Sequence, residues 1–150
     1  MSNYQIRKEK DYWIGLKNEE IVKDKLDKYF NTNLKSNPRY AVCDFENDDY
    51  VIEFKNRNNS INTYKTTLIG QNKIEYMKNK LNSDKDHREL YFVFNYTDGL
   101  YFIQITNEVL NKFDEKRRGG RNDRGSDEFY KNGYCYIPTN LLTKIELDNK

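Results

Sequence analysis

The sequence predicts a single α/β domain that spans residues 1–150. Its length suits one domain. Apolar residues recur at helical spacing in some segments and alternate with polar residues in others, which indicates helices mixed with strands. Only 36% of the residues are hydrophobic, yet 13 Tyr and 8 Phe supply large rings for a core, so we do not expect disorder.

Composition also limits the class of protein. No apolar run approaches the length of a membrane span, and the first residues contain no apolar stretch typical of secretion signals. We therefore expect a soluble, intracellular protein without a membrane partner. The formal net charge is only +2, so nucleic-acid binding would require local clusters of basic residues. Cys43 and Cys135 lie far apart in strand-like runs, which predicts buried, reduced thiols.

In the first half of the chain, one helix precedes three strand segments. Apolar residues at helical spacing predict the helix over 11–30. A weak strand is expected near 32–36. From Arg39 onward apolar and polar residues alternate, which predicts a hairpin over 39–57 with its turn at residues 46–49.

The second half begins with a second helix at about 68–81, again from the helical spacing of apolar residues. Two aromatic-rich strands, 89–96 and 100–106, follow and are separated by Thr97-Asp98-Gly99. Asp-Gly between alternating apolar runs is a strong hairpin signal. A short helix is then expected over 107–113.

A polar segment follows the short helix. Residues 114–128 contain four arginines and three glycines but no apolar residue, which predicts a mobile basic loop inside the domain. A strand-like run resumes at 133–138. We therefore expect the C-terminal part to add a hairpin, the mobile loop and the short helix to the core.

The strand expected after the first turn carries two charged residues on one face. Alternate side chains of a strand point to opposite faces, so Glu53 and Lys55 share one face while Ile52 and Phe54 occupy the other. If Ile52 and Phe54 enter the core, the opposite face must be solvated or form a site.

The preceding strand decides whether a second carboxylate joins this face. A turn of two or four residues pairs Phe45 with Tyr50 and Asp44 with Val51, and paired residues project to the same face. Asp44 then lies one diagonal step from Glu53. A three-residue turn would place Asp44 on the wrong face.

Neighbouring carboxylates repel each other unless a cation lies between them, and oxygen ligands favour Mg²⁺ or Mn²⁺ over zinc. A nearby lysine could hold or deprotonate a water and offset negative charge, which is the equipment for metal-assisted phosphodiester hydrolysis. The alternative is a surface hairpin with a cross-strand ion pair. Asp48 and Asp49 are fallback carboxylates, although Asp is common in turns.

Asp44, followed nine residues later by Glu53-Phe54-Lys55, resembles the PD-(D/E)xK nuclease superfamily. The resemblance covers roughly 11–106 and implies a restriction-endonuclease-like αβββαβ core, with a mixed central sheet flanked by helices. It also implies a Mg²⁺ cofactor, with Mn²⁺ as a substitute, held by Asp44 and Glu53, with Lys55 as a further catalytic residue. One departure is Cys43, which stands where the family has proline.

The first helix adds a second point of resemblance. Many superfamily members, including archaeal-type Holliday junction resolvases, carry a glycine followed four residues later by a glutamate that joins the metal site. Gly15 and Glu19 match that spacing, which implies Glu19 as a third catalytic and metal-binding carboxylate. Glu20 is the rival candidate.

The second helix adds a third point. Superfamily nucleases often place Gln or Asn, with Lys or Tyr, on the helix after the Glu-x-Lys strand. This implies that Gln71 orients the scissile phosphate and that Lys73 pairs with the nucleic-acid backbone. Asn72 and Tyr76 are similar to the QxxxY motif of the RecB-like branch, with Asn in place of Gln. Ordinary polar residues at a helix start are the alternative.

The resemblance implies an endonuclease that acts on DNA, with RNA as a second possible substrate. No zinc finger or helix-turn-helix is recognisable, so we expect selectivity for junctions or flaps rather than for sequence. A homodimer would use the aromatic hairpin 90–106, which we expect to be exposed. The alternative is an inactive nuclease-fold module that binds nucleic acid or protein. The basic residues expected to contact nucleic acid are Arg57, Lys73, Arg117, Arg118 and Arg121.

Overall fold

The computed structural model describes residues 2–116 and 133–147. The chain forms two compact units, one of residues 1–34 with 146–150 and one of residues 35–145. In the described part of the chain, no helix combines the length and the apolar composition needed to cross a membrane.

The first unit consists mainly of the helix α1, Asn3–Phe30. It begins eight residues earlier than the apolar spacing predicts, because a capping box formed by Ser2 and Gln5 satisfies amides that the start of a helix leaves unpaired. It ends where Asn31 adopts a left-handed conformation with φ of 51° and donates its amide to carbonyls of the last turn.

Only part of the expected apolar stripe of α1 is buried. Val22 and Leu26 are buried, whereas Ile21 is exposed. The carboxylate of Asp27 accepts the amide of Leu34 at 2.8 Å, which ties the chain after the helix back to its last turns. This unit is therefore stabilised by polar contacts at the end of α1 as well as by apolar burial.

The second unit is built on a six-stranded sheet with the order β1-β2-β3-β5-β6-β9. β3 and β5 are parallel, and the other neighbouring strands are antiparallel. This mixed sheet confirms the expected α/β class. The strands are β1 Lys35–Ser36, β2 Phe45–Glu46, β3 Tyr50–Asn56, β5 Glu89–Tyr96, β6 Gly99–Gln104 and β9 Thr143–Lys144.

A second, three-stranded sheet corrects two expectations. The helix expected from residue 68 begins only at Gln71, because Thr66–Gly70 form the strand β4 and pair with β8, Tyr134–Pro138. The β-branched residues of β4 and its alternating burial favour a strand. On the other side of β8 lies β7, Asp114–Lys116, so the expected mobile loop begins as a strand. The rest of that loop, 117–128, lies outside the described residues.

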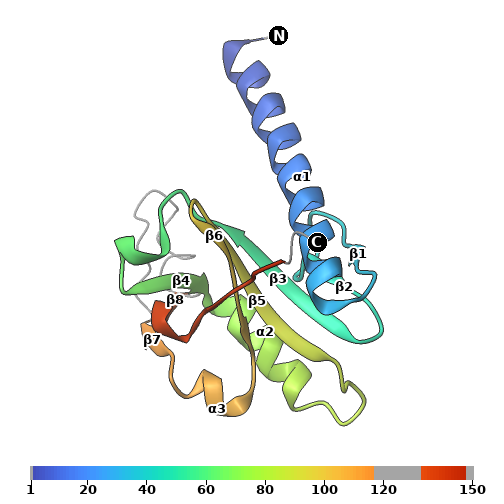
Figure 1. Ribbon diagram of the computed structural model, residues 1–150, viewed down its shortest axis with the longest axis vertical. Helices are drawn as coiled ribbons and strands as arrows, with labels where there is room; N and C mark the ends of the chain where they lie inside the picture. The colour runs from blue at the N-terminus through green and yellow to red at the C-terminus, as the bar shows by residue number, and fades with distance from the viewer. Residues whose placement is uncertain (1, 117–132, 148–150) are drawn as a thin grey trace. The chain divides into compact units, whose positions relative to one another are not determined.

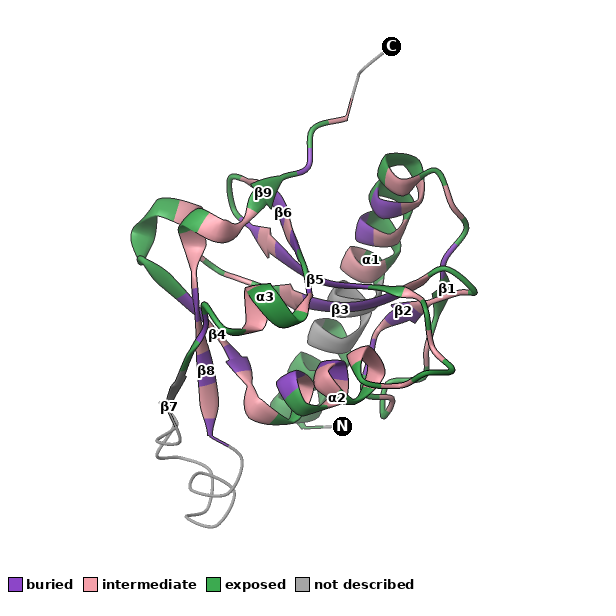
Figure 2. Cartoon of the chain, turned by 90° about the horizontal axis from the view of Figure 1, so that it is seen from below, coloured by how far each residue is buried: buried purple, intermediate pink, exposed green. Residues whose placement is uncertain are grey.

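The main hydrophobic cluster lies on one face of the six-stranded sheet. Helix α2, Gln71–Leu81, contributes Met77, the sheet contributes Val51 and Phe92, and the three-stranded sheet contributes Cys135. Figures 1 and 2 show α2 running across the face formed by β3 and β5. Both cysteines are buried free thiols, as predicted.

The hairpin of β5 and β6 is confirmed, with Tyr96 opposite Gly99 and a two-residue turn between them. Gly99 has φ of 154°, a conformation that side-chain-bearing residues rarely adopt. Most aromatic side chains of this hairpin are buried, including Phe92 and Phe94, so it is not the exposed aromatic surface that we expected. The short helix α3, Asn107–Leu110, follows it.

Candidate active site

The site begins with the pairing of β2 and β3. Phe45 lies opposite Ile52, not opposite Tyr50, so the expected register is wrong by two residues. A shift by two leaves each side chain on the face predicted for it, because strand faces alternate with a period of two. The phenyl rings of Phe45 and Phe54 lie 6.3 Å apart on one face. Most of the first strand expected in this hairpin is instead turn and bend, and β2 contains only two residues.

Asp44 precedes β2 and is held by three backbone contacts. Its amide donates to the carbonyl of Ile52 at 3.0 Å, although Asp44 lies in a bend outside the ladder, where Ile52 pairs with Phe45. The Asp44 carbonyl accepts the amide of Asn37 at 2.9 Å. Its Oδ2 accepts the amide of Phe54 at 2.8 Å, which fixes the carboxylate beside β3.

Glu53 lies at the centre of β3 and is only 2% exposed. Ile52 and Phe54 are buried on the opposite face, as expected, but the face that carries Glu53 is buried as well. Val51, which points to the same face, belongs to the main hydrophobic cluster, and so does Phe92, which pairs with Glu53 across the sheet. The surface ion-pair alternative therefore does not apply to Glu53, because its carboxylate is buried among apolar side chains.

Two lysines share one oxygen of this carboxylate. The Nζ of Lys55 lies 3.4 Å from Glu53 Oε1, and the Nζ of Lys73 lies 3.3 Å from the same atom. Lys73 also donates to the carbonyl of Val42 at 2.5 Å. The other oxygen, Oε2, is buried and has no hydrogen-bond partner among the described residues. An unsatisfied buried carboxylate oxygen is costly and indicates a functional role, such as the binding of a cation.

Burial shifts the protonation of this group. Loss of solvation and, to a smaller extent, the negative charge of Asp44 together raise the pKa of Glu53 to about 7. The positive charges of Lys55 and Lys73 oppose this shift. Near neutral pH the carboxylate is thus close to its own pKa, and a divalent cation beside it would favour the ionised form.

The donor set fits a hard divalent cation. Asp44 lies near enough for its charge to act on Glu53, and Oε2 of Glu53 has no hydrogen-bond partner among the described residues. Within residues 2–116 and 133–147, no cluster of three or more His, Cys, Asp or Glu side chains could hold a metal ion. Mg²⁺ is commonly bound by only one or two carboxylates, with waters and substrate phosphates completing the shell. Two carboxylates are therefore sufficient for Mg²⁺.

Glu19 and its rival Glu20 lie on α1, in the first unit. Gln71 is the first residue of α2, and its side chain donates to Glu75 at 3.1 Å on the surface. Arg117, Arg118 and Arg121 lie outside the described residues.

The side chain of Arg57, which directly follows β3, is held by contacts within the protein. Its Nε donates to the hydroxyl of Thr67 at 2.8 Å, and its Nη2 donates to the carbonyl of Leu68. The guanidinium lies 5.3 Å from the centroid of the Phe94 ring. Arg57 therefore joins the first sheet to β4, which leaves fewer of its donors for a phosphate.

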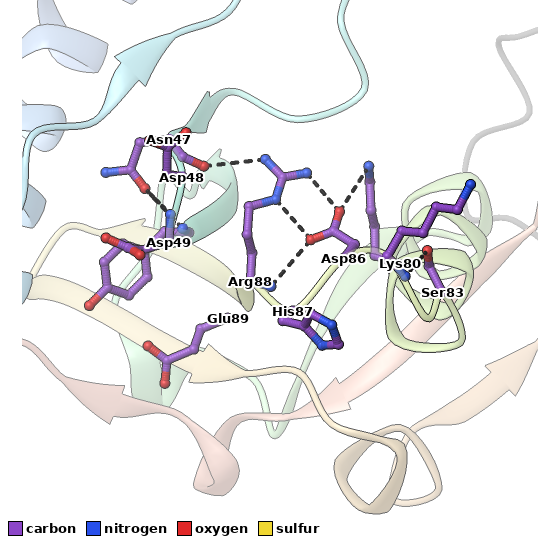
Figure 3. Close-up of a pocket in the computed structure, with 11 residues that line it drawn as sticks. Asn47, Asp48, Asp49, Lys80, Ser83, Asp86, His87, Arg88 and Glu89 are labelled. Atoms are coloured by element: carbon purple, nitrogen blue, oxygen red, sulfur yellow. Dashed lines mark hydrogen bonds and ion pairs between the residues drawn. The ribbon is translucent and has the colours of Figure 1, made fainter.

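A second charged region surrounds an open hollow of about 960 Å³ at the amino ends of β3 and β5 (Figure 3). The guanidinium of Arg88 contacts Asp86 at 2.8 Å and Glu46 at 2.9 Å. The fallback carboxylates, Asp48 and Asp49, line this hollow. The carboxylate that reaches β3 beside Glu53 is Asp44, which is held by the amide of Phe54.

Comparison with known families gives one match. A family model described as "Phage putative PDDEXK endonuclease" matches residues 6–145, nearly the whole chain. No curated protein and no solved structure matches the chain. The matched range contains most of α1, both carboxylates of the site and both lysines.

Proposed function

Since the chain belongs to this phage PDDEXK endonuclease family, we propose that it is a metal-dependent endonuclease that hydrolyses phosphodiester bonds in DNA. The buried carboxylate of Glu53 carries the proposal. Its Oε2 has no partner among the described residues, and it lies beside Asp44 and two lysines. A structural surface ion pair would be solvated and satisfied, and this carboxylate is neither.

Asp44 and Glu53 are the residues that would hold Mg²⁺, with Mn²⁺ as the expected substitute. When bound, such an ion polarises a phosphoryl oxygen and lowers the pKa of a coordinated water. The amide of Phe54 aims the Asp44 carboxylate, and the apolar surroundings of Glu53 keep competing water away from its oxygens. Both features support a preorganised site.

We propose that Lys55 holds the water that attacks the phosphate. Its Nζ lies 3.4 Å from Glu53 Oε1, and its side chain is 38% exposed, so it can reach both the carboxylate and a substrate. In this position the ammonium group can hold the water and offset the negative charge that develops on the phosphate. We further propose that Gln71 orients the scissile phosphate and that Glu19 adds a third carboxylate.

The substrate we favour is branched DNA, such as a junction or flap. The family is one of endonucleases, which supports a nucleic-acid substrate. We propose that the whole chain acts as one nuclease-like domain, works as a homodimer and contacts the backbone through its basic residues. Arg117, Arg118 and Arg121 are the proposed contacts from the polar segment, and Arg57 and Lys73 from the second unit.

A cleavage panel tests this proposal. The wild type, Glu53→Gln and Lys55→Met would be incubated with a four-way junction, a flap, linear duplex, single-stranded DNA and RNA, each with Mg²⁺, Mn²⁺ or EDTA. We expect metal-dependent cutting that both substitutions abolish, while Glu108→Gln, on the exposed face of α3, leaves cutting unchanged. Tight binding without cutting in either metal, unaffected by the substitutions, would instead establish an inactive binding module.

A further inference from the structure

Lys73 joins the two segments that carry the carboxylates. It is the third residue of α2, and its ammonium lies 3.3 Å from Glu53 Oε1 and 2.5 Å from the carbonyl of Val42, two residues before Asp44. Its side chain is 18% exposed, against 38% for Lys55. Of the two lysines, Lys73 is therefore the more deeply placed, and it is held by two acceptors on different segments.

When both carboxylates are ionised, the charges of the site balance without a metal. Asp44 and Glu53 then contribute two negative charges, and Lys55 and Lys73 contribute two positive charges around a single carboxylate oxygen. A divalent cation bound to the same carboxylates would leave an excess of two positive charges. Charges a few ångströms apart at a largely buried site interact strongly, so one ammonium should leave as the cation enters.

The two lysines differ in whether the ammonium group can move away from Glu53 and still keep its other function. The role proposed for Lys55 requires its ammonium near the reacting water. Lys73 has the carbonyl of Val42 as a second acceptor, so its ammonium can leave Oε1 and remain hydrogen-bonded. The longer Lys73 contact is the one to the carboxylate, and the shorter contact is the one to the carbonyl.

We propose that Lys73 is a built-in counter-ion of the metal-free site, which holds Glu53 and the Val42 segment together until a divalent cation displaces its ammonium from Glu53. This inference rests on the proposed function, because it requires Asp44 and Glu53 to be the metal ligands. Lys73 is thus a positioning residue that competes with the metal and sets the metal affinity.

Calorimetric titration with Mn²⁺ at pH 8.5 tests the competition. The proteins would be the wild type, Lys73→Met, Lys73→Arg and Lys78→Met. Lys78 is a matched control, because it lies on the same helix and pairs with Glu75 on the surface at 3.8 Å. We expect Lys73→Met to bind Mn²⁺ on the order of tenfold more tightly, because it removes a positive charge beside the ligand oxygen. Lys73→Arg, which keeps the charge, and Lys78→Met should bind like the wild type.

Amine labelling of the unmodified protein gives a second test that does not depend on folding of a variant. The wild type would be acetylated briefly with and without saturating Mn²⁺, and each lysine would be quantified by mass spectrometry. We expect Mn²⁺ to increase labelling of Lys73 severalfold while labelling of Lys78 stays constant.

The outcomes separate the two proposals. Mn²⁺ binding that is equal or weaker in Lys73→Met, or unchanged labelling of Lys73, would overturn the counter-ion role and leave the metal site intact. No Mn²⁺ binding by the wild type would overturn the metal site and the counter-ion role together. Binding that Glu53→Gln abolishes and Lys73→Met strengthens would support both.

Discussion

The second unit contains two charged regions built from the same residue types, one around Arg88 and one around Glu53. They differ in how completely their charged groups are paired. Around Arg88 the acidic side chains that contact the guanidinium are closely paired. Asp86 is held by Arg88 and by Lys80, at 2.8 and 3.3 Å, and these contacts keep the pKa of Asp86 well below its usual range. Around Glu53 two lysines share one oxygen, the other oxygen has no partner in the described residues, and burial raises the pKa.

The comparison separates a structural ion network from a candidate active site. The Arg88 network is half-exposed and satisfied, so it joins Glu46 of β2 to the loop before β5 at little electrostatic cost. The Glu53 carboxylate is buried, and one of its oxygens has no hydrogen-bond partner among the described residues. Such a costly arrangement is typical of functional sites. Counting charged residues would rank the two regions equally, whereas burial and satisfaction of hydrogen bonds distinguish them.

Neutralising one carboxylate in each region should produce the largest contrast. We expect Glu53→Gln to lower cutting by at least about 100-fold and to raise the free energy of unfolding at pH 8 by about 1–3 kcal/mol, because it removes a buried charge. Asp86→Asn should leave cutting unchanged and lower the free energy of unfolding by about 1 kcal/mol, because it breaks satisfied contacts. Urea denaturation and a cleavage assay measure both effects. Equal changes in stability for the two variants would contradict the distinction.

The pH dependence of stability should also differ in sign. A raised carboxyl pKa means that the folded protein binds a proton more tightly than the unfolded chain, so Glu53 lowers stability as pH rises from about 4.5 to about 7. The depressed pKa of Asp86 acts in the opposite direction, and its stabilisation is lost as pH falls below the ordinary value of 3.8. The difference in the free energy of unfolding between Glu53→Gln and the wild type, measured by urea denaturation, should therefore grow by about 2 kcal/mol between pH 5 and pH 8. If this difference did not change with pH, the pKa of Glu53 would not be raised in the folded protein, which would contradict the burial of its charged form.

The elements α1, the β2–β3 hairpin, α2 and β5, and the faces of β3, could be predicted because they depend on local patterns, whereas β4 and β7 could not. The change from helical to alternating spacing indicates the predicted elements. Alternation along β3 correctly places Glu53 with Lys55, and a register error of two residues does not disturb that assignment. The aim of Asp44 depends on its backbone contacts with Asn37 and Ile52 and on the Phe54 amide, which no local pattern encodes.

The burial of Glu53 could not be predicted, because it depends on segments distant in the sequence. Its face is covered by the cluster that includes α2, β4 and β8, and β8 lies about eighty residues beyond Glu53. A prediction that misses β4 also misplaces the start of α2, and it gives no indication that the Lys73 side chain contacts Glu53. The resemblance to superfamily nucleases implies that Lys73 contacts nucleic acid, whereas its contacts here are with Glu53 and Val42.

The smallest predicted effect tests whether Arg57 belongs with the satisfied or the unsatisfied charges. Its guanidinium donates to Thr67 and Leu68 and lies over Phe94, so its contacts resemble those of Arg88. Arg57→Lys cannot reproduce the planar fork and should lower the free energy of unfolding by about 1 kcal/mol. If those contacts are its main role, the salt dependence of DNA binding should stay that of the wild type. A shallower salt dependence with unchanged stability would instead place Arg57 on the phosphate backbone of the substrate.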